Sequence, residues 1–512
     1  MQEEMNPSTG ERLRIPWIAA LISFGVHLVA NPHYGFFRDE LYLIICGRHP
    51  QWGYVDQPPV SCLLAAGSQM FGHSLVLLRA IPAFFAAGGV YVTCLLAAEM
   101  GGGAFAQVLS ALVVFFAPVL MNFGMKVSPD IVGLWLWPLA ALWTLRLTRG
   151  ADPRRWLAVG AIIGICIQSK YSVVFFLSAV LLGLLLTPER RILFSRWFLA
   201  GCGVCTLIAL PNFLWQAHYA FPMLELLRHG QQGKNVIVGP VQYIFQQLLI
   251  TNIFLSPVWI IGLGWLLRHA RLRFLGYGYV LLIAFMMALH GKHYYPADVY
   301  PVLMAAGGVA IEAWTNRWKM LQRALAAVVV GLGLVFVPLA LPILPEPQVV
   351  AYTDWLFGVL HIPRKAVATE HGRMAALPQD WADMHGWPEL AATVAQVYHS
   401  LPPADRTRAA IFASNYGEAA AIDFFGTNDG LPPALSGHNQ YYLWGTHGAS
   451  GEIIIDVAGD CGADDHSFAS SQRAATFTSP WVMPYEDGIP IMVCRGLRQP
   501  LADLWPRVKN YR

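Results

Sequence analysis

Residues 37 to 60 read FRDELYLIICGRHPQWGYVDQPPV and gather charge in a chain that otherwise avoids it. Asp39, Glu40 and Asp56 supply three carboxylates, and Arg38 and Arg48 supply two guanidinium groups. The first part of the stretch has apolar side chains at helical spacing, which predicts an amphipathic helix lying in a membrane interface. The two prolines of VDQPPV then favour extended backbone and end the loop before the next apolar run.

The rest of the chain is apolar enough for a membrane protein. Hydrophobic residues make up 56% of its 512 residues, charged residues only 13%, and the mean hydropathy is +0.46. A soluble domain has roughly 45–50% apolar residues. The net charge is only +3, and Lys and Arg form short clusters between apolar runs. The composition therefore predicts a polytopic membrane protein and gives no support to nucleic-acid binding.

Apolar runs long enough to cross a bilayer predict about eleven to thirteen transmembrane helices. Their centres lie near residues 22, 87, 112, 138, 162, 179, 206, 258, 282, 306 and 332. Arg12 and Arg14 precede the first run, so the N-terminus is expected in the cytoplasm. The same alternation places four basic loops inside, at residues 146–156, 188–197, 268–274 and 315–323. The outer face then receives residues 37–60, the segments MKVSPD, SKYS and HGKHYYPADVYP, and residues 215–238.

A change of composition near residue 342 predicts two domains. We expect residues 1–342 to form the transmembrane domain, with a first external loop at about 31–75, and residues 343–512 to form a small exported α/β domain. Strand patterns occur in RAAIFAS (408–414), GEIIIDVAG (451–459) and IPIMVCRG (489–496). NYGEAAAIDFFG (415–426) predicts a helix, whose N-terminus could bind an anion or simply belong to α/β packing.

Two cysteines, Cys461 and Cys494, lie in the exported tail. An oxidising compartment permits disulfides, so we expect these two to pair. Cys46 and Cys62 flank the opening motif, and a bridge between them is a further possibility. The other cysteines lie in apolar runs, where Cys behaves as a small hydrophobic residue.

These motifs resemble the protein O-mannosyltransferase superfamily, glycosyltransferase family 39 and its bacterial relatives, which include the lipid A aminoarabinose transferases. The resemblance rests on FRDE followed by YVDQPPV after the first apolar run, and on the later GKHYYPADVYP, SPD and SKYS segments. It covers roughly residues 15 to 345. The tail motifs NYGEAAAIDFFG and SGHNQYYLWG resemble only the tails of uncharacterised bacterial members.

The resemblance implies a membrane glycosyltransferase of the GT-C fold in the cytoplasmic membrane of a bacterium. It would move a sugar from a polyprenyl-phosphate donor to a hydroxyl of a glycan, lipid or protein acceptor at the outer face. Such a transfer needs a carboxylate that takes the acceptor's proton. By family position Asp39 would be the base of an inverting transfer, and Glu40 would orient Asp39 or the acceptor. Asp56 could bind the acceptor, or hold Arg38 or Arg48 in place.

The leaving lipid phosphate needs cations at the outer boundary of the membrane. Lys126, Lys170 and Lys292 are the candidates, although each could instead extend to lipid head groups. His293, Tyr294 and Tyr295 follow Lys292 and suit contact with phosphate, sugar or isoprenoid. Asp130 could line the same cavity or cap the helix that follows it.

Metal binding and transport are the weaker alternatives. Glu225 and His229 are four residues apart, so with His218 they could form part of a metal site. Some GT-C enzymes use a divalent metal, whereas the resemblance to protein mannosyltransferases implies none, and no other cofactor is expected. A transporter or flippase of a lipid-linked glycan would show polar residues near the bilayer midplane. The ionisable residues here concentrate at one face instead, which favours surface chemistry.

Overall fold

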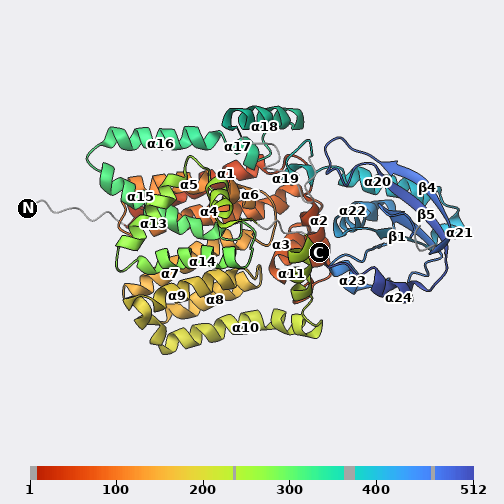
Figure 1. Cartoon of the computed structure of the whole chain (residues 1–512), viewed down its shortest axis with the longest axis horizontal. Coiled ribbons are helices and arrows are strands. Elements are labelled where there is room, and N and C mark those ends of the chain that lie inside the picture. Colours follow the sequence, from red (N-terminus) through yellow and green to blue (C-terminus); the bar gives the residue numbers. More distant parts are fainter. Residues whose placement is uncertain (1–8, 234–237, 362–374, 463–466, 512) are drawn as a thin grey trace, which may run out of the picture. The chain divides into compact units, whose positions relative to one another are not determined.

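The computed structural model describes residues 9–233, 238–361, 375–462 and 467–511. Packing divides the chain into two compact units, whose elements are labelled in Figure 1. The helical unit comprises Met1–Pro32, Val76–Leu214 and Asn235–Ile343. The mixed unit comprises His33–Leu75, Trp215–Lys234 and Leu344–Arg512.

The helical unit consists of helices joined by short connections. They are α1 (Thr9–Ala30), α4 (Leu75–Glu99), α5 (Ala104–Phe115), α6 (Pro118–Phe123), α7 (Ile131–Thr148), α8 (Arg155–Ile167), α9 (Val173–Leu185), η1 (Pro188–Phe194), most of α10 (Arg196–His218), α12 (Pro240–Ile250), α13 (Ser256–Arg268), α14 (Arg273–Ala288), η2 (Ala297–Val299), α15 (Tyr300–Thr315), α16 (Lys319–Leu334) and α17 (Val337–Ala340).

Close helix packing in this unit depends on small residues. Helix α13 packs on α15, α9 on α14, α5 on α15, and α7 on α8. Gly262 of α13 lies against the Leu303 carbonyl and Gly307 of α15 against the Val258 carbonyl, where neither position has room for a Cβ. Small residues at helix contacts are characteristic of membrane proteins, because they let two backbones approach.

Every predicted run centre lies within a helix of this unit, but the number of spans is not confirmed. Among the described residues, four helices are long and apolar enough to cross a membrane, namely α1, α4, α7 and α10. A fifth is possible if α9 and η1, which meet at a bend of 115°, count as one span. Several predicted runs are interrupted; α5, for example, ends shortly before Pro118, whose missing N–H suits a new helix start.

The mixed unit combines helices with one sheet. Its helices are α2 (Arg38–Arg48), α3 (Pro59–Ser68), α11 (Pro222–Gly233), α18 (Glu346–Leu360), α19 (Gln379–Ala382), α20 (Trp387–Ser400), α21 (Pro403–Arg406), α22 (Tyr416–Phe425), η5 (Gly426–Asp429), α23 (Gln440–Trp444), α24 (Leu501–Leu504) and η6 (Trp505–Arg507). Its strands are β1 (Ala409–Ala413), β2 (Ala434–Leu435), β3 (Ile453–Val457), β4 (Phe468–Phe477) and β5 (Ile489–Leu497).

The sheet has the strand order β2-β1-β3-β5-β4. Strand β1 is parallel to β2 and β3, whereas β5 is antiparallel to both β3 and β4. Helices α20 and α22 pack against the sheet (Figure 1). A buried core that includes Trp505 and the two tail cysteines also contains residues of β1, β2, β3 and β5. The predicted strands β1, β3 and β5 and the predicted helix α22 are confirmed. Strands β2 and β4 had no sequence signal, since β2 has two residues and β4 is a largely exposed edge strand.

Helix α2 is present as predicted, but it does not lie exposed along a surface. Residues Glu40 to Cys46 are all buried, because α3 and α22 both pack on α2. Gly47 lies against the Cys62 carbonyl with no room for a Cβ, which brings α2 and α3 together. Trp52 is exposed, whereas Tyr54 is buried and its hydroxyl donates to the Cys46 carbonyl at 2.7 Å. Burial of every residue from Glu40 to Cys46 replaces the expected amphipathic arrangement, and only the ends of the helix are accessible.

The compact units do not coincide with the predicted domains. Residues 33–75, expected to belong to the transmembrane domain, pack with the C-terminal residues in the mixed unit. The short segment Trp215–Lys234 belongs to the same unit. The predicted boundary at residue 342 concerns which residues lie in the membrane and which are exported. It stays a prediction, because the compact units are defined by packing alone.

Candidate active site

The predicted site residues fall into two sets. Arg38, Asp39, Glu40 and Asp56 lie in the mixed unit, and the predicted lysines, together with Asp130 and the segment His293–Tyr295, lie in the helical unit.

Asp39 is a half-exposed carboxylate in the first turn of α2. Its side chain is 38% exposed. The Tyr416 hydroxyl donates to its Oδ1 at 2.8 Å, and Arg38 Nε donates to the same atom at 3.4 Å. Asp39 is therefore an accessible carboxylate with a fixed orientation, which a general base requires.

Arg38 is held by the C-terminal part of the chain. Its guanidinium lies 3.7 Å from Asp383 Oδ2, donates to the Tyr485 hydroxyl at 3.0 Å, and lies 5.5 Å from the centre of the Tyr416 ring. Burial alone would lower the pKa of Arg38, but Asp383, Tyr416 and Asp39 together raise it well above its ordinary value. Arg38 thus stays charged beside Asp39.

Glu40 has a structural position. Its side chain is fully buried, and Oε2 accepts a hydrogen bond from the Phe37 backbone N–H at 2.9 Å. This contact satisfies a free donor at the start of α2. In the structure Glu40 caps α2, and its predicted role in orienting Asp39 or the acceptor stays a prediction.

Asp56 is bound by residues other than the predicted arginines. Tyr42 donates to its Oδ1 at 3.0 Å and Asn439 Nδ2 donates to its Oδ2 at 3.3 Å. Arg48, by contrast, lies 3.3 Å from His73 Nε2. Burial raises the pKa of Asp56 to about 7, against the opposing effect of its hydrogen-bond donors. The expectation that Asp56 holds Arg38 or Arg48 is wrong, because Tyr42 and Asn439 take its two oxygens.

Tyr416 and Asn439 are site residues that the sequence reading did not identify. Both lie in tail motifs, NYGEAAAIDFFG and SGHNQYYLWG, but neither motif has a recognisable chemical pattern. Burial raises the pKa of Tyr416 well above its ordinary value, so its hydroxyl remains a donor. At the start of α22, Asn415 Oδ1 accepts from the backbone N–H groups of Gly417 and Glu418. This capping favours the packing interpretation of the helix N-terminus over anion binding.

In the helical unit the structure brings Asp130, Lys170, Tyr294 and Tyr295 together. Lys170 forms an ion pair with Asp130, and its Nζ lies 4.8 Å from the Tyr295 ring centre and 5.2 Å from that of Tyr294. Lys292 Nζ lies 5.9 Å from the Tyr294 ring centre. Cations beside aromatic rings are suited to an anionic ligand with an apolar tail, although Asp130 already pairs with Lys170.

The remaining predicted residues have other partners. Lys126 is buried and donates to Asn122 Oδ1 at 3.0 Å, while the His293 carbonyl accepts from Gln247 Nε2 at 2.9 Å. Asp298, which follows in the same sequence motif, was not predicted. It is buried against Gly133, which has no room for a Cβ at this contact.

The weakly predicted metal residues are used in other contacts. Glu225 accepts from Lys509 Nζ at 2.7 Å, and His229 Nδ1 donates to the Tyr511 carbonyl at 3.0 Å. His218 is packed edge-on against the neighbouring Tyr219 ring. These contacts give the three residues roles within the fold.

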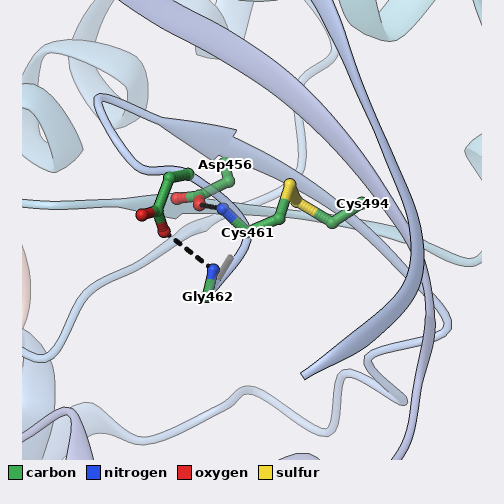
Figure 2. The surroundings of a disulfide bond; sticks show 5 residues. Asp456, Cys461, Gly462 and Cys494 are labelled. Carbon is green, nitrogen blue, oxygen red and sulfur yellow. Dashed lines mark hydrogen bonds between the residues drawn. A yellow bond between two sulfur atoms is a disulfide. The ribbon is translucent and has the colours of Figure 1, made fainter. Parts of the chain in front are cut away.

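The predicted disulfide between Cys461 and Cys494 is confirmed (Figure 2). Asp456 lies beside it and accepts from the Cys461 backbone N–H at 2.9 Å. Asp456 and the two sulfur atoms are near enough to share a metal, but the disulfide occupies both sulfurs. Cys46 and Cys62 are buried free thiols, so the second possible bridge is not formed.

Comparison with known proteins agrees with the resemblance that the sequence motifs suggested. Residues 56–215 match the family described as dolichyl-phosphate-mannose-protein mannosyltransferase. This range includes Asp56, Lys126, Asp130 and Lys170 but begins after Asp39. No curated protein matches the chain.

Two solved structures share the fold. ArnT from Cupriavidus metallidurans in the apo state has 17% identity and a TM-score of 0.63. The same protein bound to undecaprenyl phosphate has 16% identity and a TM-score of 0.60. Each alignment covers 95% of this chain and 98% of the ArnT chain. The predicted resemblance is confirmed, and the chain shares the fold of these two structures.

Proposed function

We propose that the protein transfers a sugar from a polyprenyl-phosphate donor to an acceptor hydroxyl at the outer face of a bacterial cytoplasmic membrane. The family match and the common fold with a structure that holds undecaprenyl phosphate support a lipid-linked donor. The Cys461–Cys494 disulfide supports an exported tail, because such bonds persist in oxidising compartments.

The observation that carries the proposal is the half-exposed Asp39 carboxylate, oriented by Tyr416 and Arg38. Asp39 takes the proton of the acceptor hydroxyl while that oxygen attacks the anomeric carbon of the donor. The bond from this carbon to the lipid phosphate breaks on the opposite side, so the configuration inverts. The bonding pair leaves with the phosphate, and the products are the glycosylated acceptor and the polyprenyl phosphate.

Lys170 and Lys292 are proposed as contacts of the lipid phosphate. Both lie in segments that the sequence predicts at the outer face, and both have tyrosine rings beside them. Charge-assisted hydrogen bonds to phosphate are stronger than neutral ones and would stabilise the charge that develops as the leaving group departs.

The test compares wild type with Asp39→Asn on a panel of polyprenyl-phosphate sugars, with membrane extract as the source of acceptors. We expect Asp39→Asn to lose about a hundredfold or more in kcat, as removal of a general base does. Asp503→Asn, an exposed carboxylate at the start of α24, is the matched control and should behave as wild type.

Two outcomes would contradict the proposal in different ways. Equal transfer by wild type and Asp39→Asn would remove Asp39 as the base. Absence of turnover with every donor, together with substrate-driven flux across reconstituted vesicles, would favour the transporter or flippase.

A further inference from the structure

Three separated parts of the C-terminal sequence converge on Arg38 and Asp39. Asp383 accepts from the Arg38 backbone N–H at 2.9 Å through its carbonyl and pairs with the guanidinium through its carboxylate. Tyr485 accepts from the same guanidinium, and Tyr416 donates to Asp39. The tail therefore supplies most of the polar surroundings of the proposed base.

The position of Tyr416 is fixed by the local structure of α22. Asn415 caps the helix, and its own N–H donates to Glu418 Oε2 at 3.2 Å, which completes a reciprocal cap. The ring of Tyr416 lies 4.7 Å from the Tyr42 ring and 4.9 Å from the His438 ring, measured between centres. A side chain held at both its backbone and its ring can direct its hydroxyl with precision.

A second tail motif reaches the other carboxylate. Gln440 Oε1 accepts from the Val55 backbone N–H at 3.1 Å, and the Gln440 backbone N–H donates to the Tyr42 hydroxyl at 3.1 Å. Tyr42 in turn donates to Asp56, which also accepts from Asn439. Hydrogen bonds arranged in series polarise one another, so this network orients the loop on which Asp56 lies.

The contacts to Asp39 distinguish its two oxygens. Tyr416 and Arg38 both donate to Oδ1. No hydrogen bond to Oδ2 occurs within the described ranges, and the side chain is 38% exposed. Oδ2 is then the oxygen available to take the proton of an acceptor hydroxyl.

We propose that Tyr416 is a positioning residue that holds Oδ1 of Asp39 and directs Oδ2 toward the acceptor, and that the tail is thereby part of the reaction centre. This inference rests on the proposed function of Asp39. It goes beyond that function by giving the C-terminal domain a defined role in turnover. A tail that only covers the membrane domain would leave the chemistry of Asp39 unaffected.

The test is Tyr416→Phe, which removes the hydroxyl and keeps the ring packed against Tyr42 and His438. We expect kcat to fall about tenfold to a hundredfold, the effect of losing a hydrogen bond to a charged group, while KM changes little. Tyr398→Phe is the matched control, since its hydroxyl donates to the Arg406 carbonyl of the same tail.

A double substitution separates positioning from a general structural effect. If Tyr416 acts through Asp39, then Tyr416→Phe should change the residual activity of Asp39→Asn very little, because effects of residues that act as a unit are not additive.

The outcomes distinguish this inference from the proposed function. Full activity of Asp39→Asn would overturn the function itself. A severe loss in Asp39→Asn with unchanged kcat in Tyr416→Phe would overturn only the role of Tyr416. A loss of activity in Tyr416→Phe that is equally large in the Asp39→Asn background would also overturn it, because the hydroxyl would then act independently of Asp39.

Discussion

Replacing Cys461 and Cys494 with alanine should destabilise the C-terminal sheet, and the length of the loop that the disulfide closes determines by how much. The bond joins residues separated by 33 positions. In the chain-entropy model a loop of that length stabilises the folded state by about 3.7 kcal/mol at 25 °C. Alanine keeps the Cβ of cysteine, so the positive φ of 61° at Cys461 gains no additional strain. We expect the free energy of unfolding of the mixed unit to fall by about this amount.

Pulse proteolysis in urea measures the change on the full chain in detergent, with a C-terminal tag to follow the tail. With a urea dependence of about 2–3 kcal/mol per M, the midpoint should fall by about 1–2 M. Reduction of wild type should give the same decrease and should leave the double variant unchanged. The double substitution Cys202→Ala/Cys205→Ala is the control, because both are free thiols in α10. An unchanged midpoint in the Cys461 and Cys494 variant would refute the reasoning.

Three further predictions concern the surroundings of Arg38, the titration of Glu486 and the charge of Lys170. Gly417→Ala should stabilise helix α22 by up to about 1 kcal/mol, but the new Cβ would lie 2.5 Å from Arg38 Cγ and displace that side chain. We expect kcat to fall while the urea midpoint of unfolding does not decrease. An unaltered kcat would contradict the close packing of Gly417 on Arg38. Burial raises the pKa of Glu486 to about 7, so its stabilising protonated form is lost as pH rises from about 4.5 to 7. The free energy of unfolding of Glu486→Gln, measured by pulse proteolysis, should therefore rise by about 1–3 kcal/mol relative to that of wild type between pH 5 and pH 8. A difference in unfolding free energy that stays constant over this pH range would be inconsistent with the titration of Glu486. Lys170→Met should raise the KM for the lipid donor about tenfold in initial-rate assays. The substitution also leaves Asp130 without its ion-pair partner. An unaltered KM would show that Lys170 does not bind the phosphate.

Local properties of the sequence were sufficient for the membrane character, the helices and the disulfide. Each apolar run centre lies in a helix, because length and apolar composition act within a few turns of chain. The Cys461–Cys494 pair followed from their being the two cysteines of the tail and from the compartment expected for it. The strand β4 was missed because FASSQRAATF, largely exposed on both faces, lacks the alternation of a half-buried strand.

Only the tertiary structure decided what surrounds the carboxylates. Asp39 and Tyr416 are 377 residues apart, and Asp56 and Asn439 are 383 residues apart. Contacts over such separations leave no periodic pattern in either segment, so a sequence motif can identify Asp39 but not the hydroxyl that orients it. The position of Glu40 beside Asp39 in the sequence suggested a role in the chemistry. Its burial and its hydrogen bond from the Phe37 N–H, which place it as a cap of α2, arise only when the chain folds.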